Sequence, residues 1–542
     1  MSALRLRPFH LAAENLTVAR GGRSLFTHLS LTLSAGSRLA IVGENGRGKT
    51  TLLHTLLGRV IPDAGSITLH GEAGIAEQAL EFDAGDTVGT LLERALEPSR
   101  RAVEELDAAA AALAEDPARH ADRYAAALQT AELLDAWDAD RRVDVALEAL
   151  SACTDRNRLL TELSVGQRYR VRLACLLGAP QELQLLDEPT NHLDTSGLTF
   201  LTEKIRAHPG GVALVSHDRQ LLADVADHFL DLDPTHDGAP RLYGGGYQGW
   251  IEGRRKEWEA WEQEYQRQTA ERTRLQDALS AAQNRLSTGW RPDKGTGKHQ
   301  RQSRAPSVVQ QVKRQAQALG EHHITVPKPP MTLQMPTLHS KPTAVYLSVE
   351  NVSLPPRLSR PVSLQLRGGD KLLVTGPNGT GKSTLLHLMA GTLAPGTGHV
   401  RHRQDARISL VGQENPPWDS QRTAREIFEA HTRRLVSTRR IRPQQACSLD
   451  GFGLLDEQAQ NTAVSALSQG QQRRLELALR LAELPHVLLL DEPSNHLAMQ
   501  LVDELTEALI RTEAAVVVAT HDRAMIRDLS GFRRLRLGDA TS

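Results

Sequence analysis

The chain has 542 residues, with 64 Lys or Arg and 65 Asp or Glu, so its formal net charge is −1. This length accommodates two to four domains with separate hydrophobic cores. The near-zero charge excludes nucleic-acid binding driven by the overall charge, so such a contact needs a local basic patch. Three isolated cysteines argue against a zinc site or a disulfide framework and favour a reducing compartment.

Apolar runs in the chain are short. None approaches the ~18 residues of a membrane-spanning helix, and residues 1–10 lack the apolar run of a signal peptide. We therefore expect a soluble, cytoplasmic protein.

The first 247 residues predict an α/β domain built around a nucleotide site. Alternating apolar residues between 11 and 35 predict half-buried strands, and the apolar run 39–42 predicts a buried strand. A glycine-rich turn and a leucine-rich helix follow, which is the context of a P-loop. Lys49 is expected at the β- and γ-phosphates and Thr50 at Mg²⁺. The expected nucleotide-binding residues are Gly43, Asn45, Gly46, Gly48, Lys49, Thr50 and Thr51.

An Ala-rich, helical segment at about 95–150 interrupts this first domain. The N-terminal half carries about 31 more residues than the C-terminal half between Gln78 and Ser164. We interpret the excess as an inserted helical arm. The alternative is a simple length difference in a helical subdomain.

Residues 248–330 predict a charged helical hairpin. Apolar residues recur at steps of three and four over about four heptads, which indicates a coiled coil, and Gln268 and Arg272 interrupt the seam. Between Arg285 and Arg314 there are eight Lys or Arg residues and one acid. Such a basic, aromatic-bearing tip fits RNA contact, although a solvated coil whose tryptophans pack on the domains is the alternative. The candidate RNA-binding residues are Trp290, Arg291, Lys294, Lys298, Arg301 and Arg304.

Residues 331–542 repeat the first domain. A second P-loop follows the strand 372–375, and its expected nucleotide-binding residues are Gly376, Asn378, Gly379, Gly381, Lys382, Ser383 and Thr384. Both halves contain an aliphatic strand ending in Asp-Glu. Asp187 and Asp491 are expected near Mg²⁺, and Glu188 and Glu492 are placed to polarise the attacking water. The pairs Ser164 and Ser468, Glu188 and Glu492, and His217 and His521 are each 304 residues apart. The predicted fold is α/β, with two P-loop domains joined by an α-helical coiled-coil hairpin.

The remaining motifs resemble the ATP-binding cassette superfamily. Segments 163–167 and 467–471 look like its signature motif, which implies ATP contacts from Ser164, Gly166, Gln167, Ser468, Gly470 and Gln471. Gln78 and Gln413 look like Q-loop residues, which implies a place near the metal. His217 and His521 look like the catalytic switch histidines, whereas the alternative for an isolated histidine is a satisfied core position. The metal set is then Thr50, Gln78, Asp187, Ser383, Gln413 and Asp491.

Two cassettes, an arm and a helical hairpin resemble the ABC-F family of translation factors and ribosome-protection proteins. The resemblance implies a monomer whose cassettes close head to tail over two ATPs. Lys49 then shares ATP with Ser468, and Lys382 shares ATP with Ser164. It also implies that the linker reaches peptidyl-tRNA, rRNA and the peptidyl-transferase centre. Ala498 replaces the aspartate found at Asp194, so the two sites are expected to be unequal.

Three functions compete for this architecture. The first is a ribosome-bound ATPase that leaves on ATP hydrolysis and gives antibiotic resistance. The Arg-rich composition and the departures from the family pattern, which include Ala498 and the replacement of the middle signature glycine by Val165 and Gln469, look more like resistance proteins than housekeeping factors. The second is the ATP-hydrolysing subunit of a drug exporter with a separate membrane partner, which leaves the basic hairpin unexplained. The third, a DNA-repair ATPase, lacks the zinc motifs or longer coiled coils of that class.

Overall fold

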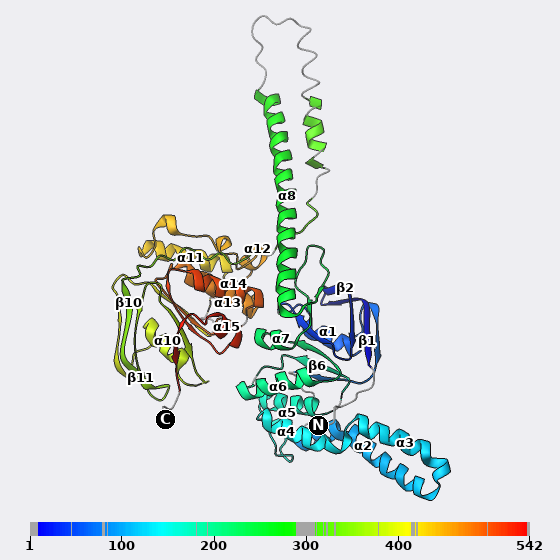
Figure 1. Cartoon of the computed structure of the whole chain (residues 1–542). Coiled ribbons are helices and arrows are strands. Elements are labelled where there is room, and N and C mark those ends of the chain that lie inside the picture. Colours follow the sequence, from blue (N-terminus) through cyan, green and yellow to red (C-terminus); the bar gives the residue numbers. More distant parts are fainter. Residues whose placement is uncertain are drawn as a thin grey trace, which may run out of the picture.

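The computed structural model describes residues 9–538 except 45, 78–81, 84, 180, 192, 289–308, 311, 318, 321–323, 330–331, 378, 414–417, 419–420 and 496. Two α/β bodies lie side by side, and a long helix stands away from them (Figure 1). The predicted α/β class is confirmed, because each half contains an antiparallel sheet and a mainly parallel sheet.

The first body places its mainly parallel sheet at the centre. Its antiparallel sheet has the order β2 (Arg23–Ser34), β1 (His10–Arg20), β4 (Ala64–His70). The six-stranded sheet has the order β5 (Ala73–Ala76), β6 (Leu183–Asp187), β7 (Gly211–Val215), β3 (Arg38–Val42), β8 (His228–Asp231), β9 (Arg241–Tyr243). Strands β3, β6 and β7 are buried at every position, as expected for parallel strands covered on both faces. The predicted buried strand at 39–42 is confirmed.

The helices of the first body cover the sheet and form a protrusion. They are α1 (Lys49–Leu56), α2 (Val88–Glu115), α3 (Pro117–Leu133), α4 (Ala139–Ala149), α5 (Val165–Gly178), α6 (Thr195–Ala207) and α7 (Arg219–Val225). Helices α2 and α3 project as a hairpin (Figure 1), held by a small apolar cluster that includes Ala109, Ala127 and Ala131. Helix α4 instead packs within the main core of the body. The protruding part is therefore the α2–α3 pair.

The second body repeats this plan. Its antiparallel sheet has the order β11 (Leu358–Arg367), β10 (Val345–Leu354), β13 (Thr397–His402), and its parallel sheet β14 (Ile408–Val411), β15 (Val487–Asp491), β16 (Ala515–Ala519), β12 (Lys371–Thr375), β17 (Arg533–Arg536). Its helices are α10 (Lys382–Ala390), α11 (Ala424–Ser437), α12 (Glu457–Gln460), α13 (Gln469–Ala482), α14 (Met499–Arg511) and α15 (Arg523–Asp528). Short 3₁₀ turns occur in both bodies: Ala136–Asp138 and Leu160–Glu162 in the first, and Pro443–Gln445, Leu449–Phe452 and Val464–Ala466 in the second.

Helix α8 (Gly246–Thr288) has 43 residues and is about 65 Å long at 1.5 Å per residue. The helix predicted from the apolar period is confirmed. The returning chain lies along it, because Trp261 Nε1 donates to Pro327 O at 2.8 Å and the Gln268 side chain accepts from Thr325 N at 2.9 Å. Gln268, a polar interruption of the predicted seam, thus binds the returning backbone.

The base of α8 is fixed to the first body by aromatic packing. Trp250 is 2% exposed, and its ring stacks on Phe229 with a centroid distance of 5.3 Å. Tyr247 meets both rings edge-on. The interpretation that a helix tryptophan packs on a domain is confirmed for Trp250.

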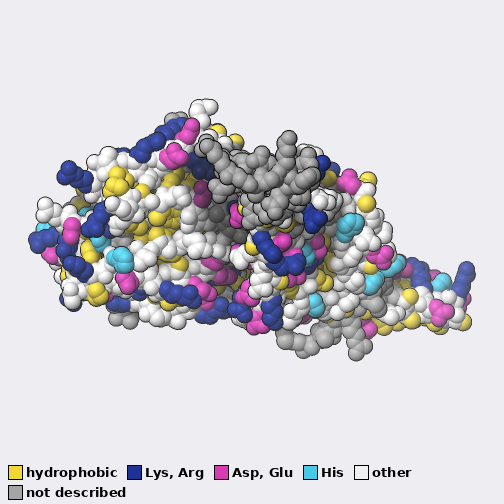
Figure 2. Space-filling model, turned by 90° about the horizontal axis from the view of Figure 1, so that it is seen from above, with side chains coloured by type: hydrophobic (Ala, Val, Ile, Leu, Met, Phe, Trp, Pro, Cys, Tyr) yellow, Lys and Arg dark blue, Asp and Glu magenta, His cyan; other side chains and the backbone are white. Residues whose placement is uncertain are grey.

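Seen from the linker end, charges of both signs are interspersed over the face of the two bodies, and the arm projects to one side (Figure 2). Among the described helices, none combines the length and apolar character needed to cross a membrane.

Candidate ATP sites and the contact between the two cassettes

Each P-loop joins a buried strand to a helix. Gly48 and Gly381 precede α1 and α10 with φ of 92° and 93°, a left-handed conformation that glycine adopts without strain. Lys49 Nζ donates to Gly43 O at 2.7 Å, and Lys382 Nζ donates to Gly376 O at 2.8 Å. Both lysines are thus held over their loops, at the N-terminus of a helix where a phosphate is favoured.

The residues proposed for Mg²⁺ lie at the ends of neighbouring elements. Thr50 Oγ1 donates to Asp187 Oδ2 at 2.7 Å. In the second body both carboxylate oxygens of Asp491 are buried, and among the described residues the nearest donor is the Ser383 hydroxyl, which lies beyond ordinary hydrogen-bond distance. Burial raises the pKa of Asp491, and the Ser383 hydroxyl opposes this effect. A buried carboxylate of this kind fits a cation ligand, because a cation supplies the missing partner.

Glu188 follows β6 in an environment that suits a general base. Its φ is 50°, a strained value for a residue with a side chain. Its Oε1 lies 3.3 Å from His217 Nε2, and its Oε2 accepts from His217 N at 3.3 Å. Burial raises the pKa of Glu188 to about 7, while Lys49 opposes the shift. A carboxylate with a pKa near neutrality is matched to proton abstraction at physiological pH.

Glu492 occupies the same place after β15, with φ of 47°. Its Oε1 lies 2.8 Å from His521 Nδ1, and its Oε2 accepts from Thr520 Oγ1 at 3.1 Å. The hydrogen bond to Glu492 raises the pKa of His521. The glutamate and histidine expected at each site are therefore adjacent, but the two pairs differ in the histidine nitrogen used.

The signature segments begin α5 and α13. Ser164 Oγ accepts from Gln167 N at 3.3 Å, and the Gln167 side chain accepts from Ser164 N at 2.9 Å. Ser468 and Gln471 make the same pair of bonds, at 3.2 and 3.0 Å. Each serine thus caps a helix whose N-terminal N–H groups favour an anion.

The two bodies meet P-loop to signature helix. Arg474, near the start of α13, is ion-paired with Glu44 of the first P-loop. This contact places the Lys49 loop of the first cassette opposite the Ser468 helix of the second, across the interface. The equivalent ion pair cannot form at the other site, because Pro377, which has no carboxylate, stands in the place of Glu44.

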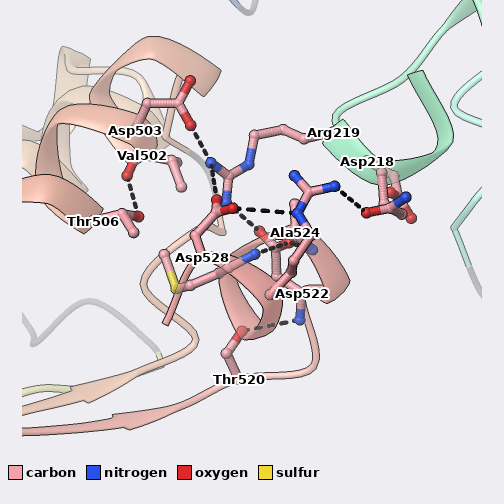
Figure 3. Close-up of polar contacts among 12 residues, drawn as sticks. Asp218, Arg219, Val502, Asp503, Thr506, Thr520, Asp522, Ala524 and Asp528 are labelled. Atoms are coloured by element: carbon pink, nitrogen blue, oxygen red, sulfur yellow. Dashed lines mark hydrogen bonds and ion pairs between the residues drawn. The ribbon is translucent and has the colours of Figure 1, made fainter. Parts of the chain in front are cut away.

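A second contact joins the segments directly after the two histidines (Figure 3). Arg523 NH2 donates to Asp218 Oδ2 at 3.1 Å, and Arg219 NH2 lies 3.6 Å from Asp522 Oδ2. The two pairs are related by the 304-residue repeat, so the contact is reciprocal. Arg219 additionally pairs with Asp503 and with Asp528 and is 3% exposed. The reciprocal contact is therefore asymmetric.

Sequence reasoning did not find these contact residues. The His-Asp-Arg triplets at 217–219 and 521–523 carry a signal, because they repeat at the same 304-residue spacing as the candidate catalytic glutamates. Arg474 and Glu44 carry no such signal, since their partners come from different halves. Tyr169 and Arg473 were also missed; they occupy equivalent positions, and each donates to the carbonyl of the strand-ending aspartate, at 3.1 and 3.0 Å.

Several expected residues lie outside the described part of the chain. These are Asn45, Gln78, Asn378 and the whole basic tip, namely Trp290, Arg291, Lys294, Lys298, Arg301 and Arg304. Gln413 is described; it is exposed, two residues after β14.

Paired P-loops, strands ending in Asp-Glu and capped signature helices define an ATP hydrolase with two ATP-binding cassettes. The family model for the ABC transporter matches residues 26–191 and 359–495. A tylosin resistance ATP-binding protein, TlrC of Streptomyces fradiae, is 35% identical over 541 residues and 96% of each chain. The chain therefore belongs to the ABC transporter family, and its full-length relatives make it an ABC-F type protein.

Two further relatives align over most of both chains. An antibiotic resistance protein of Mycobacteroides abscessus is 30% identical over 94% of each chain. The energy-dependent translational throttle protein EttA of Mycobacterium tuberculosis is 28% identical over 95% of this chain and 89% of its own. Among solved structures, the archaeal ribosome recycling factor aABCE1, in complex with the stalk protein aP1, matches with a TM-score of 0.54 at 16% identity, over 97% of this chain and 88% of that one. That likeness supports the tandem-cassette fold.

Proposed function

We propose that this ATPase binds the ribosome in a closed, ATP-bound state, directs its linker toward tRNA and the peptidyl-transferase centre, and leaves on hydrolysis. The observation that carries the proposal is α8, a 43-residue helix fixed at one cassette and standing away from both (Figure 1). The alternative, an ATP-hydrolysing subunit of a drug exporter, leaves this helix unexplained. The names of two relatives, one for tylosin resistance and one for translation, agree with a role at the ribosome.

In this proposal the two ATP sites are formed between the cassettes. Lys49 and Ser468 share one ATP, in agreement with the Glu44–Arg474 contact, and Lys382 and Ser164 share the other. Glu188 and Glu492 accept the proton of the attacking water, and His217 and His521 orient the γ-phosphate. Thr50 with Asp187, and Ser383 with Asp491, would hold Mg²⁺, which neutralises phosphate charge when bound.

Antibiotic resistance by ribosome protection is the biological role that we propose. The full-length similarity to two resistance proteins supports it. A monomer suffices, because one chain supplies both P-loops and both signature helices.

The proposal is tested by sedimentation of the Glu188→Gln, Glu492→Gln double variant with ribosomes on a sucrose gradient. With ATP, we expect the variant to move into the ribosomal fraction, because it binds ATP without hydrolysing it and stays closed. Without ATP, it should remain at the top. A variant that stays at the top with ATP bound, or that sediments with membranes instead, would refute the proposal.

A further inference from the structure

The base of the linker helix is tied to two carboxylates at the end of the first cassette's sheet. Arg254 of α8 places NH1 3.0 Å from Asp231 Oδ2, and its NH2 donates to Asp233 Oδ2 at 2.9 Å. The carboxylate side chains are 5% and 8% exposed, and the Arg254 side chain is 19% exposed. Arg254 thus compensates both nearly buried carboxylates, and Asp233 Oδ1 also lies 3.8 Å from Arg47 Nε of the P-loop.

The same carboxylate holds the first P-loop. The second oxygen of Asp233, Oδ1, accepts from the backbone N–H of Glu44 at 2.7 Å. The carbonyls of Gly43 and Glu44 in turn accept from Lys49 Nζ, at 2.7 and 3.3 Å. A continuous set of contacts therefore leads from α8 to the lysine that is expected to bind the phosphates.

Neighbouring groups keep this arrangement in one geometry. Asp231 accepts from Trp250 Nε1 at 2.9 Å and from the N–H of Asp233 at 2.9 Å. Burial would raise the pKa of Asp233, but Arg254 and the Glu44 N–H hold that pKa below its usual value. Asp233 is thus ionised when Arg254 is in place, which makes its hydrogen bond to the P-loop a charge-assisted one.

The second cassette has no counterpart of this arrangement. In the sheets, Val42 pairs with Asp231, and Thr375 pairs with Arg536 at the equivalent place. Gly538 consequently stands where Asp233 stands in the first cassette. The P-loop residue equivalent to Glu44 is Pro377, which has no N–H to donate. The chain thus contains a P-loop with this anchor and one without it.

We propose that Arg254 is a positioning residue for the first ATP site: by holding Asp233 against the N–H of Glu44, it makes ATP affinity at Lys49 depend on the base of the linker helix, while the Lys382 site is independent of it. A displacement of α8 that pulls Arg254 away removes the shorter ion pair of Asp233, leaves only the 3.8 Å contact with Arg47, and loosens the loop. If the linker binds the ribosome as proposed above, the first site is the one that senses it.

Titration of the full-length chain with a fluorescent ATP, N-methylanthraniloyl-ATP, tests the inference site by site. With Lys382→Ala, binding reports the first site; with Lys49→Ala, it reports the second. Arg254→Met should weaken first-site binding by about tenfold and leave second-site binding unchanged. Second-site binding also serves as the control for folding. Arg255→Met, a neighbouring exposed arginine on α8, should change neither.

A double-mutant comparison identifies the route. With Glu44→Pro, which copies the second P-loop, the N–H is absent and Arg254→Met should have no further effect. With Glu44→Ala, which keeps the N–H, the tenfold effect should persist. Arg254→Lys, which keeps the positive charge, should retain most of the affinity. Arg254→Gln, which removes the charge but keeps an N–H donor, replaces Arg254→Met if that variant fails to fold, and it should also weaken first-site binding only.

Unchanged first-site affinity, or an equal loss at both sites, would overturn the inference. An Arg254→Met effect that persists undiminished with Glu44→Pro would overturn the route through Asp233. None of these measurements uses ribosomes, so failure of the inference is distinguishable from failure of the proposed function.

Discussion

Burial changes the protonation equilibrium of Glu188, the candidate general base of the first site. Burial raises its pKa to about 7, and the positive charge of Lys49 limits the rise. The deprotonated carboxylate is the form that accepts a proton, and its population grows as pH passes the pKa. A site that uses Glu188 therefore loses activity as pH falls through about 7.

We expect the single-turnover rate of ATP hydrolysis at the first site to rise as pH increases through about 7. The rise should be present in Glu492→Gln, which keeps the Glu188 base, and absent in Glu188→Gln. The measurement is the rate from pH 5.5 to 9 with enzyme in excess over ATP. The same rise in Glu188→Gln would show that another group titrates.

Arg219 and Arg523 form a matched pair at the cassette contact. Arg219 is 3% exposed and faces the three carboxylates of Asp503, Asp522 and Asp528 (Figure 3). The Arg523 side chain is 27% exposed and is ion-paired with Asp218. Removing the more deeply buried Arg219 affects three carboxylates, whereas removing the half-buried Arg523 affects one, and a partly solvated single pair contributes little.

Arg219→Met should lower the free energy of opening of α7 and α15 by about 3 kcal/mol, because the carboxylates it faces lose their compensating charge. Arg523→Met should lower it by less than about 1 kcal/mol. Hydrogen exchange of the amides in these helices measures both values. Equal effects of the two substitutions would contradict the asymmetry argued from burial.

Helices α6 and α14 occupy equivalent places in the two cassettes but differ in their N-cap residue. Asp194 caps α6, and its Oδ1 accepts from Gly197 N at 2.8 Å. Ala498 precedes α14 and makes no side-chain cap. The next residue, Met499, is buried among core residues of the first cassette, so this helix start lies at the cassette contact.

Ala498→Asp should stabilise the start of α14 by about 1 kcal/mol, because a carboxylate accepts from the free N–H groups of the first turn. Urea denaturation should show a higher midpoint for the variant. Ala498→Asn, which caps without charge, is the control that separates hydrogen bonding from helix-dipole effects. If Ala498→Asp leaves ATP turnover unchanged, the departure from the family pattern is neutral for activity.

At the scale of the whole molecule, the contacts with a ribosome are expected at the linker tip. The formal net charge is −1, and the face seen from the linker end mixes both signs (Figure 2). Attraction to RNA phosphates must therefore come from a local cluster, and the sequence offers one between Arg285 and Arg314.

Changing Arg291, Lys294 and Lys298 to Glu should abolish ATP-dependent ribosome binding without changing basal ATP turnover, because the tip is distant in sequence from both catalytic sites. The control makes the same charge change on the shaft, at Arg255, Arg267 and Arg274, which are exposed on α8. Co-sedimentation at several salt concentrations measures both. If ribosome binding survives the tip substitutions but is lost with the shaft substitutions, the contact lies on the helix itself.

The sequence by itself determined the two cassettes, the buried strands, the P-loop context and the long helix. Each of these depends on local order: a glycine must sit where φ is positive, a cap must precede its helix, and an apolar period fixes which face is buried. The 304-residue repeat then related the candidate catalytic glutamates and histidines of the two halves.

Only the tertiary structure decided which groups act together across these elements. Arg474 with Glu44 and Arg219 with Asp503 join residues hundreds of positions apart, and no local pattern specifies such partners. The pKa of Glu188 likewise depends on how deeply the folded chain buries it. The link from Arg254 to the first P-loop exists because β8 ends beside both, a proximity created by strand order in the sheet and absent from the order of the residues.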